Sequence, residues 1–231
     1  MAGACAVIVA GGSGSRFGGK GGKLMVEVAG KPLLTWSLLA FDRSELIGHI
    51  VVVCPRERED EMRRRAAEPY GLETPVSYAP AGGTRQDSSR AGLDAVPAGF
   101  DAVAVHDGAR PLITTETIDA AVGTLLERPE LDGVVCGQPA IDTLKRMDGT
   151  RIVDTPPRSG YWTVQTPQVF RVDVLRRAFE LAAAEGFAGT DESSLVERAG
   201  GRVECLESPR DNLKVTYPED LPLVEALLRK R

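Results

Sequence analysis

The sequence has no long apolar run and no excess of positive charge. None of its 231 residues lies in a stretch that approaches the about 18 apolar positions of a membrane span, and the formal net charge is −5. Neither a membrane nor nucleic acid is therefore predicted as a partner. The amino terminus carries no basic segment followed by an apolar one, and a cytoplasmic location is expected.

Cysteine and histidine are also scarce in the sequence. The four cysteines, Cys5, Cys54, Cys136 and Cys205, lie far apart in or beside apolar runs, and no C-x-x-C or Cys/His pairing occurs. This spacing disfavours a zinc site and predicts buried, reduced thiols. Only two histidines are present, and neither is assigned a proton transfer.

Acidic residues are missing from the first 26 positions, where glycine is abundant instead. Seven of the fourteen residues from Gly11 to Leu24 are glycine, and the charged ones are Arg16, Lys20 and Lys23. Glycine lets the backbone approach a ligand and turn successive N–H groups toward an anion, to which the cations add charge. The segment predicts an anion-binding loop, and a merely flexible surface loop is the weaker interpretation.

Two nucleotide-binding motifs nearly fit this loop, and both fail. Gly14 to Lys20 has the spacing of a P-loop, but Gly21 stands where a hydroxyl must hold magnesium. In the dinucleotide fingerprint the next glycine after Gly14 comes one position late, at Gly18, and no acid follows the second strand at 54–56. A dinucleotide oxidoreductase is therefore disfavoured.

A third pattern fits: a strand, A-G-G-x-G-x-R at 10–16, and then Lys23 seven residues after Arg16. It is typical of nucleotidyltransferases of the sugar-nucleotide type, in which the arginine and lysine hold the triphosphate. Backbone amides hold the base and ribose side, here at Ala10, Gly11, Gly12 and Gly14.

Short β-branched runs alternate with helical patterns along most of the chain. Strands are predicted at 4–10, 49–54, 75–79, 101–106 and 131–137, and helices at 31–42, about 57–67, 85–96 and 114–127. This alternation predicts an α/β fold with a doubly wound, mostly parallel, Rossmann-like sheet. The glycine loop then lies at the carboxyl ends of the strands, where such sheets bind ligands.

The alternation fails after Pro139. Residues 139–158 predict an inserted β-arm, with Asp148-Gly149 as a hairpin turn, on a single domain that spans 1–231. A helix at 172–185, strands at 203–207 and 213–216 and a last helix that carries Leu221, Val224 and Leu228 complete the prediction. Trp162 and Phe170 are expected in the core.

Seven motifs occur in order: AGGSGSRFG (10–18), GGTRQDSSRAGL (82–93), HDGARP (106–111), DTLK (142–145), QTPQVF (165–170), TDESS (190–194) and DNLKVTYPEDL (211–221). Together they resemble the 2-C-methyl-D-erythritol 4-phosphate cytidylyltransferase family of non-mevalonate isoprenoid biosynthesis. The resemblance implies an enzyme that transfers CMP from CTP to this polyol phosphate and releases pyrophosphate.

The resemblance also implies roles around the nucleotide. Arg16 and Lys23 hold the triphosphate, and the base is read at Gly82, Gly83 and Ser88. Asp107, which follows a predicted strand, suits a ribose hydroxyl or the Mg²⁺ cofactor, and Arg110 suits a phosphate.

For the acceptor, the resemblance makes Arg158 a clamp on the methylerythritol phosphate, with Lys214 as a second cation. Thr166 and Thr190 add hydroxyl donors. Thr143 on the arm corresponds to a residue that enters the neighbouring subunit's site, which implies a homodimer. The sequence departs from the family at Gly22, where proline is common before the lysine.

The acceptor's phosphate is already ionised, so the reaction needs positive charge and positioning rather than a general base. Alternatives remain open. One is another cytidylyltransferase, acting on ribitol 5-phosphate or another polyol phosphate; a second is the use of UTP instead of CTP. A third belongs to another class, a nucleotide-binding sensor that makes no product.

Overall fold

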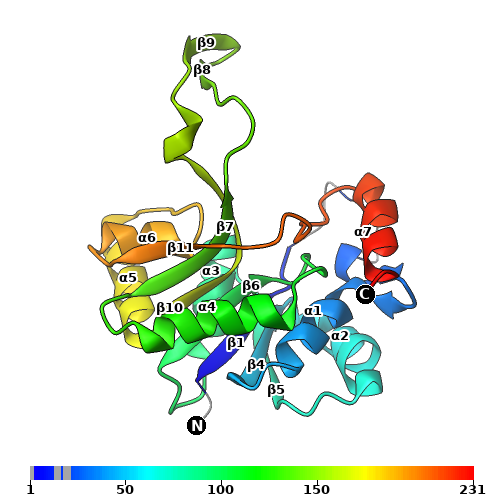
Figure 1. Ribbon diagram of the computed structural model, residues 1–231. Helices are drawn as coiled ribbons and strands as arrows, with labels where there is room; N and C mark the ends of the chain where they lie inside the picture. The colour runs from blue at the N-terminus through cyan, green and yellow to red at the C-terminus, as the bar shows by residue number, and fades with distance from the viewer. Residues whose placement is uncertain (1–2, 13–16, 18–21) are drawn as a thin grey trace.

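A computed structural model describes residues 3–12, 17 and 22–231 of the chain. In this part, seven strands form one sheet in the order β11-β7-β10-β6-β1-β4-β5 (Figure 1). Neighbouring strands are parallel except where β10 pairs with β6 and β7. The α/β, mostly parallel sheet predicted from the sequence is confirmed. The strands are β1 (Ala4–Val9), β4 (Ile47–Cys54), β5 (Val76–Pro80), β6 (Ala102–Asp107), β7 (Gly133–Pro139), β10 (Trp162–Arg171) and β11 (Val203–Glu207).

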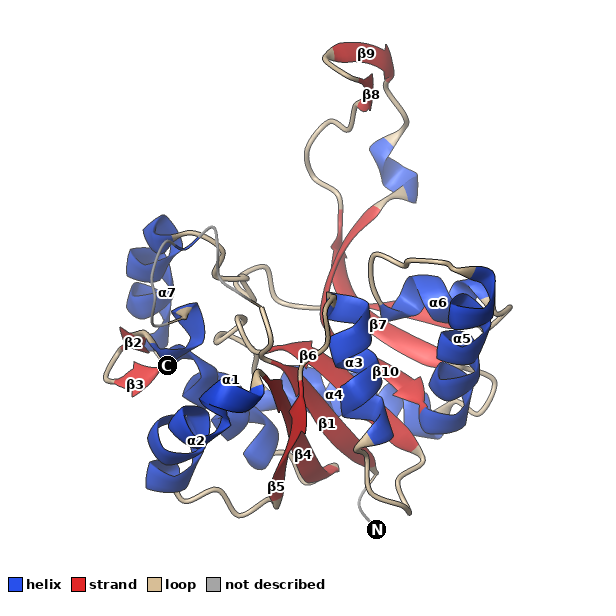
Figure 2. Cartoon of the chain, turned by 180° about the vertical axis from the view of Figure 1, so that it is seen from behind, coloured by secondary structure: helices blue, strands red, loops and turns tan. Residues whose placement is uncertain are grey.

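Helices cover both faces of this sheet. The face toward the viewer in Figure 1 carries α1 (Leu33–Asp42) and α4 (Thr115–Glu127), with α2 (Glu59–Met62) and α7 (Leu221–Leu228) beyond them. The opposite face, in front in Figure 2, carries α3 (Arg85–Asp94), α5 (Val172–Glu185) and α6 (Glu192–Arg198). The sheet is therefore doubly wound. Around α2, the expected helix is divided into 3-10 and π turns over 56–70.

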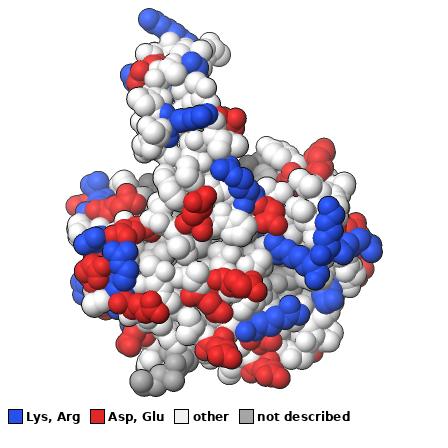
Figure 3. Space-filling model, viewed as in Figure 1, with Lys and Arg blue, Asp and Glu red and all other residues white. Residues whose placement is uncertain are grey.

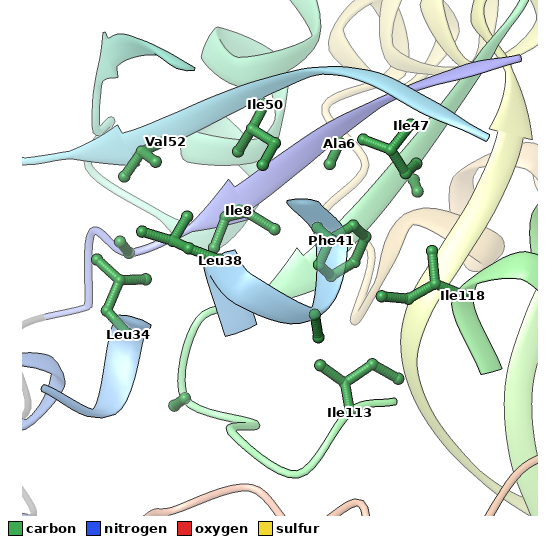
Figure 4. Close-up of a cluster of buried hydrophobic side chains, with 14 of the residues drawn as sticks. Ala6, Ile8, Leu34, Leu38, Phe41, Ile47, Ile50, Val52, Ile113 and Ile118 are labelled. Carbon is green, nitrogen blue, oxygen red and sulfur yellow. The ribbon is translucent and has the colours of Figure 1, made fainter. Parts of the chain in front are cut away.

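The core lies in two layers because successive residues of a strand point to opposite faces. On central strand β1, Ala6 and Ile8 join one buried cluster, whereas Val7 joins the other. Figure 4 shows the first cluster, in which strand residues such as Ile8 meet Leu38 and Phe41 of α1. Burial on both faces explains why these strands are almost continuously apolar.

A long excursion between β7 and β10 projects from the body of the molecule (Figure 1). Its tip is an antiparallel hairpin of β8 (Arg146–Asp148) and β9 (Arg151–Asp154). The turn is formed by residues 149 and 150, one position later than predicted. The exposed stretch runs to Val164, beyond the expected end at 158. We call residues 139–164 the arm. That the whole chain is one domain stays a prediction.

Several local expectations were wrong. Residues 213–216 form no strand; Val215 N–H donates one bond, to the Ala109 carbonyl at 2.8 Å, and no ladder continues it. Trp162 is 38% exposed because it begins β10 at the base of the arm, whereas Phe170 is fully buried as expected. Cys205 is exposed, unlike the other three thiols. Within the described ranges, no helix is long and apolar enough to cross a membrane.

The two short strands β2 (Glu27–Val28) and β3 (Lys31–Pro32) precede α1 and pair with each other. Lys31 and Pro32, expected as the first turn of the helix, therefore belong to a strand instead. Helix α4 begins as expected, because the Thr114 hydroxyl caps it by accepting from the N–H of Thr117 at 3.3 Å.

Candidate active site

A cavity of about 380 Å³ opens at the carboxyl ends of β1, β5 and β6, where sheets of this kind bind ligands. Of the predicted nucleotide loop, Ala10, Gly11 and Gly12 line it, while Gly14 and Arg16 lie outside the described residues. The lining comprises Val9, Ala10, Gly11, Gly12, Lys23, Leu24, Gly82, Gly83, Thr84, Arg85, Ser88, Asp107, Ala109, Lys214 and Thr216.

Asp107, the last residue of β6, is the carboxylate around which the charges of the cavity are arranged. It is 7% exposed; its Oδ2 accepts from Lys214 Nζ at 2.7 Å, and its Oδ1 accepts from Arg85 Nε at 3.3 Å. Arg110 Nε lies 3.7 Å from Oδ2. Among the residues described, three cations thus surround this carboxylate, and their surplus charge favours an anion in the cavity.

The protonation state of Asp107 follows from these neighbours. Burial alone would raise the pKa of this carboxyl, but Arg85 and Lys214 outweigh burial and hold the pKa well below its usual range. An ionised carboxylate is the ligand that Mg²⁺ requires. No group of three or more His, Cys, Asp or Glu side chains that could hold a metal converges here or anywhere else in the described part. One carboxylate fits a magnesium ion that is carried in largely by phosphates and water.

Arg85 lines the cavity although it is not among the residues predicted from the sequence. Its Nη1 and Nη2 donate to the two carboxylate oxygens of Glu192, at 2.7 and 3.0 Å, and Glu192 is only 1% exposed. Burial lowers the pKa of Arg85, but Glu192 and Asp107 more than compensate and raise it. A cation at the first position of a helix opposes the helix dipole. This unfavourable placement of a cation is the feature of the sequence that could have identified Arg85 as a site residue.

The glycine pair after β5 packs against the start of α3. Gly82 N–H donates to Ser88 Oγ at 3.1 Å, and the Ser88 hydroxyl donates to the Thr84 carbonyl at 2.9 Å. A Cβ on Gly82 would collide with Asp87, whereas one on Gly83 would have its nearest neighbour, Asp87 Oδ2, at 3.7 Å. The Ser88 hydroxyl is thus engaged within the chain, and its contact with a base stays a prediction.

His106 lies buried beside Asp107, where β6 leads into the loop over residues 108–114. The Thr166 hydroxyl donates to His106 Nδ1 at 3.0 Å and accepts from Asp107 N–H at 3.0 Å, while His106 Nε2 faces the Arg110 carbonyl at 3.4 Å. Burial lowers the pKa of His106 to about 3, which keeps the ring neutral. Thr166 thus supports this loop, and its predicted donation to an acceptor phosphate would require a change of partner.

Lys23 lines the cavity at the start of a 3-10 turn, and its Nζ donates to the Val215 carbonyl at 2.8 Å. Lys23 is thereby joined to the segment that carries Lys214. The preceding Gly22 has φ 67°, which proline cannot adopt because its ring fixes φ near −65°. A Cβ at this position would require only a shift of the Arg58 guanidinium, which is the end of a flexible side chain. The departure from the family at Gly22 therefore has a structural reason.

The remaining predicted residues lie outside the cavity lining. Arg110 is almost buried behind Asp107, and burial lowers its pKa. Thr190 is exposed just before α6. Thr143 and Arg158 are exposed on the arm, which Figure 1 shows projecting away from the strand ends. Within one chain, the structure does not bring these two arm residues to the cavity.

The family model of 2-C-methyl-D-erythritol 4-phosphate cytidylyltransferase matches residues 4–230 of this chain. Curated relatives with this name include a protein of Caldanaerobacter subterraneus subsp. tengcongensis, 40% identical over 97% of this chain and 98% of its own length. Another, from Geotalea uraniireducens, is 39% identical over 97% of this chain and 96% of its own length.

Solved structures agree in fold. The 4-diphosphocytidyl-2C-methyl-D-erythritol synthase of Anaerococcus prevotii superimposes with a TM-score of 0.86 at 28% identity, covering 98% of both chains. The 2-C-methyl-D-erythritol 4-phosphate cytidylyltransferase of Thermus thermophilus gives 0.79 at 30% identity, covering 99% of this chain and 100% of its own. The chain therefore belongs to the 2-C-methyl-D-erythritol 4-phosphate cytidylyltransferase family.

Proposed function

We propose that this protein transfers CMP from CTP to 2-C-methyl-D-erythritol 4-phosphate and releases pyrophosphate, in non-mevalonate isoprenoid biosynthesis. The observation that carries the proposal is the cavity at the strand ends, where Arg85 and Lys214 bind the buried carboxylate of Asp107 and Lys23 lines the same cavity. Membership of the family then selects the nucleotide and the acceptor. A cytoplasmic location remains the expectation from the sequence.

In this reaction an acceptor phosphate oxygen forms a bond to the α-phosphorus of CTP. The bond to pyrophosphate breaks, and its electron pair leaves with the pyrophosphate. No proton has to be removed from the nucleophile, because the phosphate is ionised at neutral pH. The neutral, hydrogen-bonded state of His106 agrees with a structural role for that residue.

The residues of the cavity then act through position and charge. Lys23, together with Arg16, would hold the triphosphate, and Lys214 would hold the attacking phosphate against its repulsion from CTP. Asp107 would ligate Mg²⁺ on the nucleotide phosphates, and this ion would neutralise charge that develops on them. Each cation thus offsets negative charge in a cavity where two anions must meet.

The exposed apolar side chains on the arm support a homodimer. Single exposed apolar residues are ordinary, but a cluster of them on one projection marks an interaction surface. Uncharged side chains make up most of the arm's visible surface in Figure 3. A second copy of the chain would cover them and would receive Thr143 near its cavity. Seven large apolar residues are exposed there: Ile141, Met147, Ile152, Val153, Tyr161, Trp162 and Val164.

The dimer is tested by sedimentation at several concentrations. We expect dissociation in the variant Ile152→Asp, because Ile152 is 55% exposed on the arm, and no change in Leu223→Asp, which alters an equally exposed residue on α7. A wild-type chain that sediments as a monomer at micromolar concentration would refute the dimer.

The reaction is tested by mixing the protein with MgCl₂, a nucleotide and an acceptor and measuring pyrophosphate. We expect release with CTP and 2-C-methyl-D-erythritol 4-phosphate, and much less with UTP or with ribitol 5-phosphate. Lys214→Ala should abolish most of the release, whereas Lys230→Ala, an exposed residue after α7, should not. Release with ribitol 5-phosphate alone would identify the other acceptor, and CTP binding without any release would identify a sensor.

A further inference from the structure

We propose that Glu192 is a positioning residue for the transfer. Acting through Arg85 and Asp107, it fixes the orientation of Lys214 and joins the nucleotide cavity to the segment that carries Thr190. The proposal rests on the proposed function, because Lys214 is there assigned to the acceptor phosphate, as Thr190 is by the family resemblance.

The first observation is a row of alternating charges. Glu192 binds Arg85 through two parallel hydrogen bonds of 2.7 and 3.0 Å, Arg85 Nε reaches Asp107 Oδ1 at 3.3 Å, and Asp107 Oδ2 binds Lys214 at 2.7 Å. Two parallel bonds fix the plane of a guanidinium as well as its position. The orientation of Arg85 therefore decides which oxygen of Asp107 is left for Lys214.

The second observation is a set of amide contacts beside the row. Gln86, next to Arg85, donates to the Phe187 carbonyl at 3.3 Å and accepts from Gly189 N–H at 2.9 Å. Together with the Glu192 pair, these bonds hold the chain on both sides of Thr190. The start of α3, which lines the nucleotide cavity, is thus bonded to the segment around Thr190 at three residues, Phe187, Gly189 and Glu192.

The third observation is burial. Glu192 is 1% exposed, and removing a carboxylate from water carries a large cost that an ion pair only just offsets. A packed apolar pair of similar volume generally stabilises a fold as well or better. Stability alone therefore does not account for this pair. The location of Arg85 in the wall of the cavity does, since the pair keeps this cation in one orientation beside the reacting groups.

The test compares Glu192→Gln with wild type in steady-state kinetics, with CTP and 2-C-methyl-D-erythritol 4-phosphate varied in turn. Loss of one charge-assisted bond should raise KM for the acceptor about 10-fold or more. KM for CTP should stay within about twofold. A general loss of folded protein would instead lower the maximal rate and leave both KM values unchanged. Glu185→Gln is the matched control, because it removes the same charge from an exposed pair with Arg198 of α6 and should leave both KM values unchanged.

A second variant separates function from folding. Arg85→Met/Glu192→Met replaces the half-buried arginine and the buried glutamate by apolar side chains, and we expect a Tm close to that of wild type together with weakened acceptor binding. Equal rises in both KM values, or an unchanged acceptor KM in active Glu192→Gln, would overturn the positioning role alone. A wild-type protein that releases no pyrophosphate would overturn the proposed function and this inference with it.

Discussion

The substitution Asp107→Asn tests how far the cavity depends on one buried charge. Asparagine keeps the size of the side chain and one carbonyl oxygen, but it leaves the ammonium of Lys214 and the guanidinium of Arg110 without their carboxylate. Arg85 still has Glu192. The loss therefore falls on two cations, of which Arg110 is almost buried.

Removing one partner of a buried ion pair destabilises a protein by about 3–5 kcal/mol. The Lys214 side chain is 39% exposed and regains hydration, so the lower end applies. For a chain of this size, each kcal/mol shifts Tm by about 2–4 °C. We therefore expect Asp107→Asn to lower Tm at pH 7 by about 6–12 °C.

The pH dependence has a definite sign. The pKa of Asp107 in the folded protein lies below its value in the unfolded chain, about 4. The carboxylate's contribution to stability is therefore complete above about pH 4 and is lost as the pH falls from there toward the folded-state pKa. Because asparagine does not titrate, the difference in Tm between wild type and variant should narrow below about pH 4.

Thermal unfolding followed by circular dichroism from pH 7 to pH 3 measures this difference. The control is Asp94→Asn, which removes a carboxylate from an exposed pair with Arg90 on α3 and should change Tm little at any pH. If Asp107→Asn unfolds like wild type at pH 7, or if its deficit is the same at pH 3, the charges around Asp107 do not stabilise the cavity as argued.

Three further changes test other parts of the site. Lys23→Ala should lower kcat by about 10²–10³-fold, by analogy with loss of one preorganised donor, and raise the Kd for CTP far less; an unchanged kcat would exclude Lys23 from the transition state. Gly82→Ala should destabilise the fold by about 1–3 kcal/mol in urea unfolding because its Cβ has no space, whereas Gly83→Ala should not. Thr166→Val should cost about 1–3 kcal/mol, since His106 Nδ1 loses its partner, and an unchanged stability would contradict the network.

The sequence predicted the parts of the fold that depend on local pattern. Runs of β-branched residues became buried parallel strands, and Gly11 and Gly12, which follow the first of them, lie at the strand ends. Residues 213–216 alternate apolar and polar side chains as a strand can, but they form no strand, because their neighbour is the loop after β6 and not an edge with a free ladder. Strand formation there depended on a partner that the segment itself does not specify.

The ion pairs of the site could not be predicted from the sequence for a related reason. Arg85 and Glu192 are separated by 107 positions, and their contact arises because α3 and α6 cover the same face of the sheet. Motifs predicted that Asp107 and Lys214 would be important, but not that they bind each other. A resemblance marks residues that act on ligands, and it is silent about the side chains that orient them.

The cations of the cavity already have partners before any ligand binds. Lys214 binds Asp107, Lys23 binds the Val215 carbonyl, and Arg85 is shared between two carboxylates. An incoming phosphate must therefore share each cation with its internal partner or displace that partner, so that the net gain in binding free energy is smaller than the charge of the cavity alone would provide. The same bonds hold each cation close to the place where it is needed. The electrostatic benefit thus appears chiefly where charge develops during transfer, because the cations need little reorganisation at that moment.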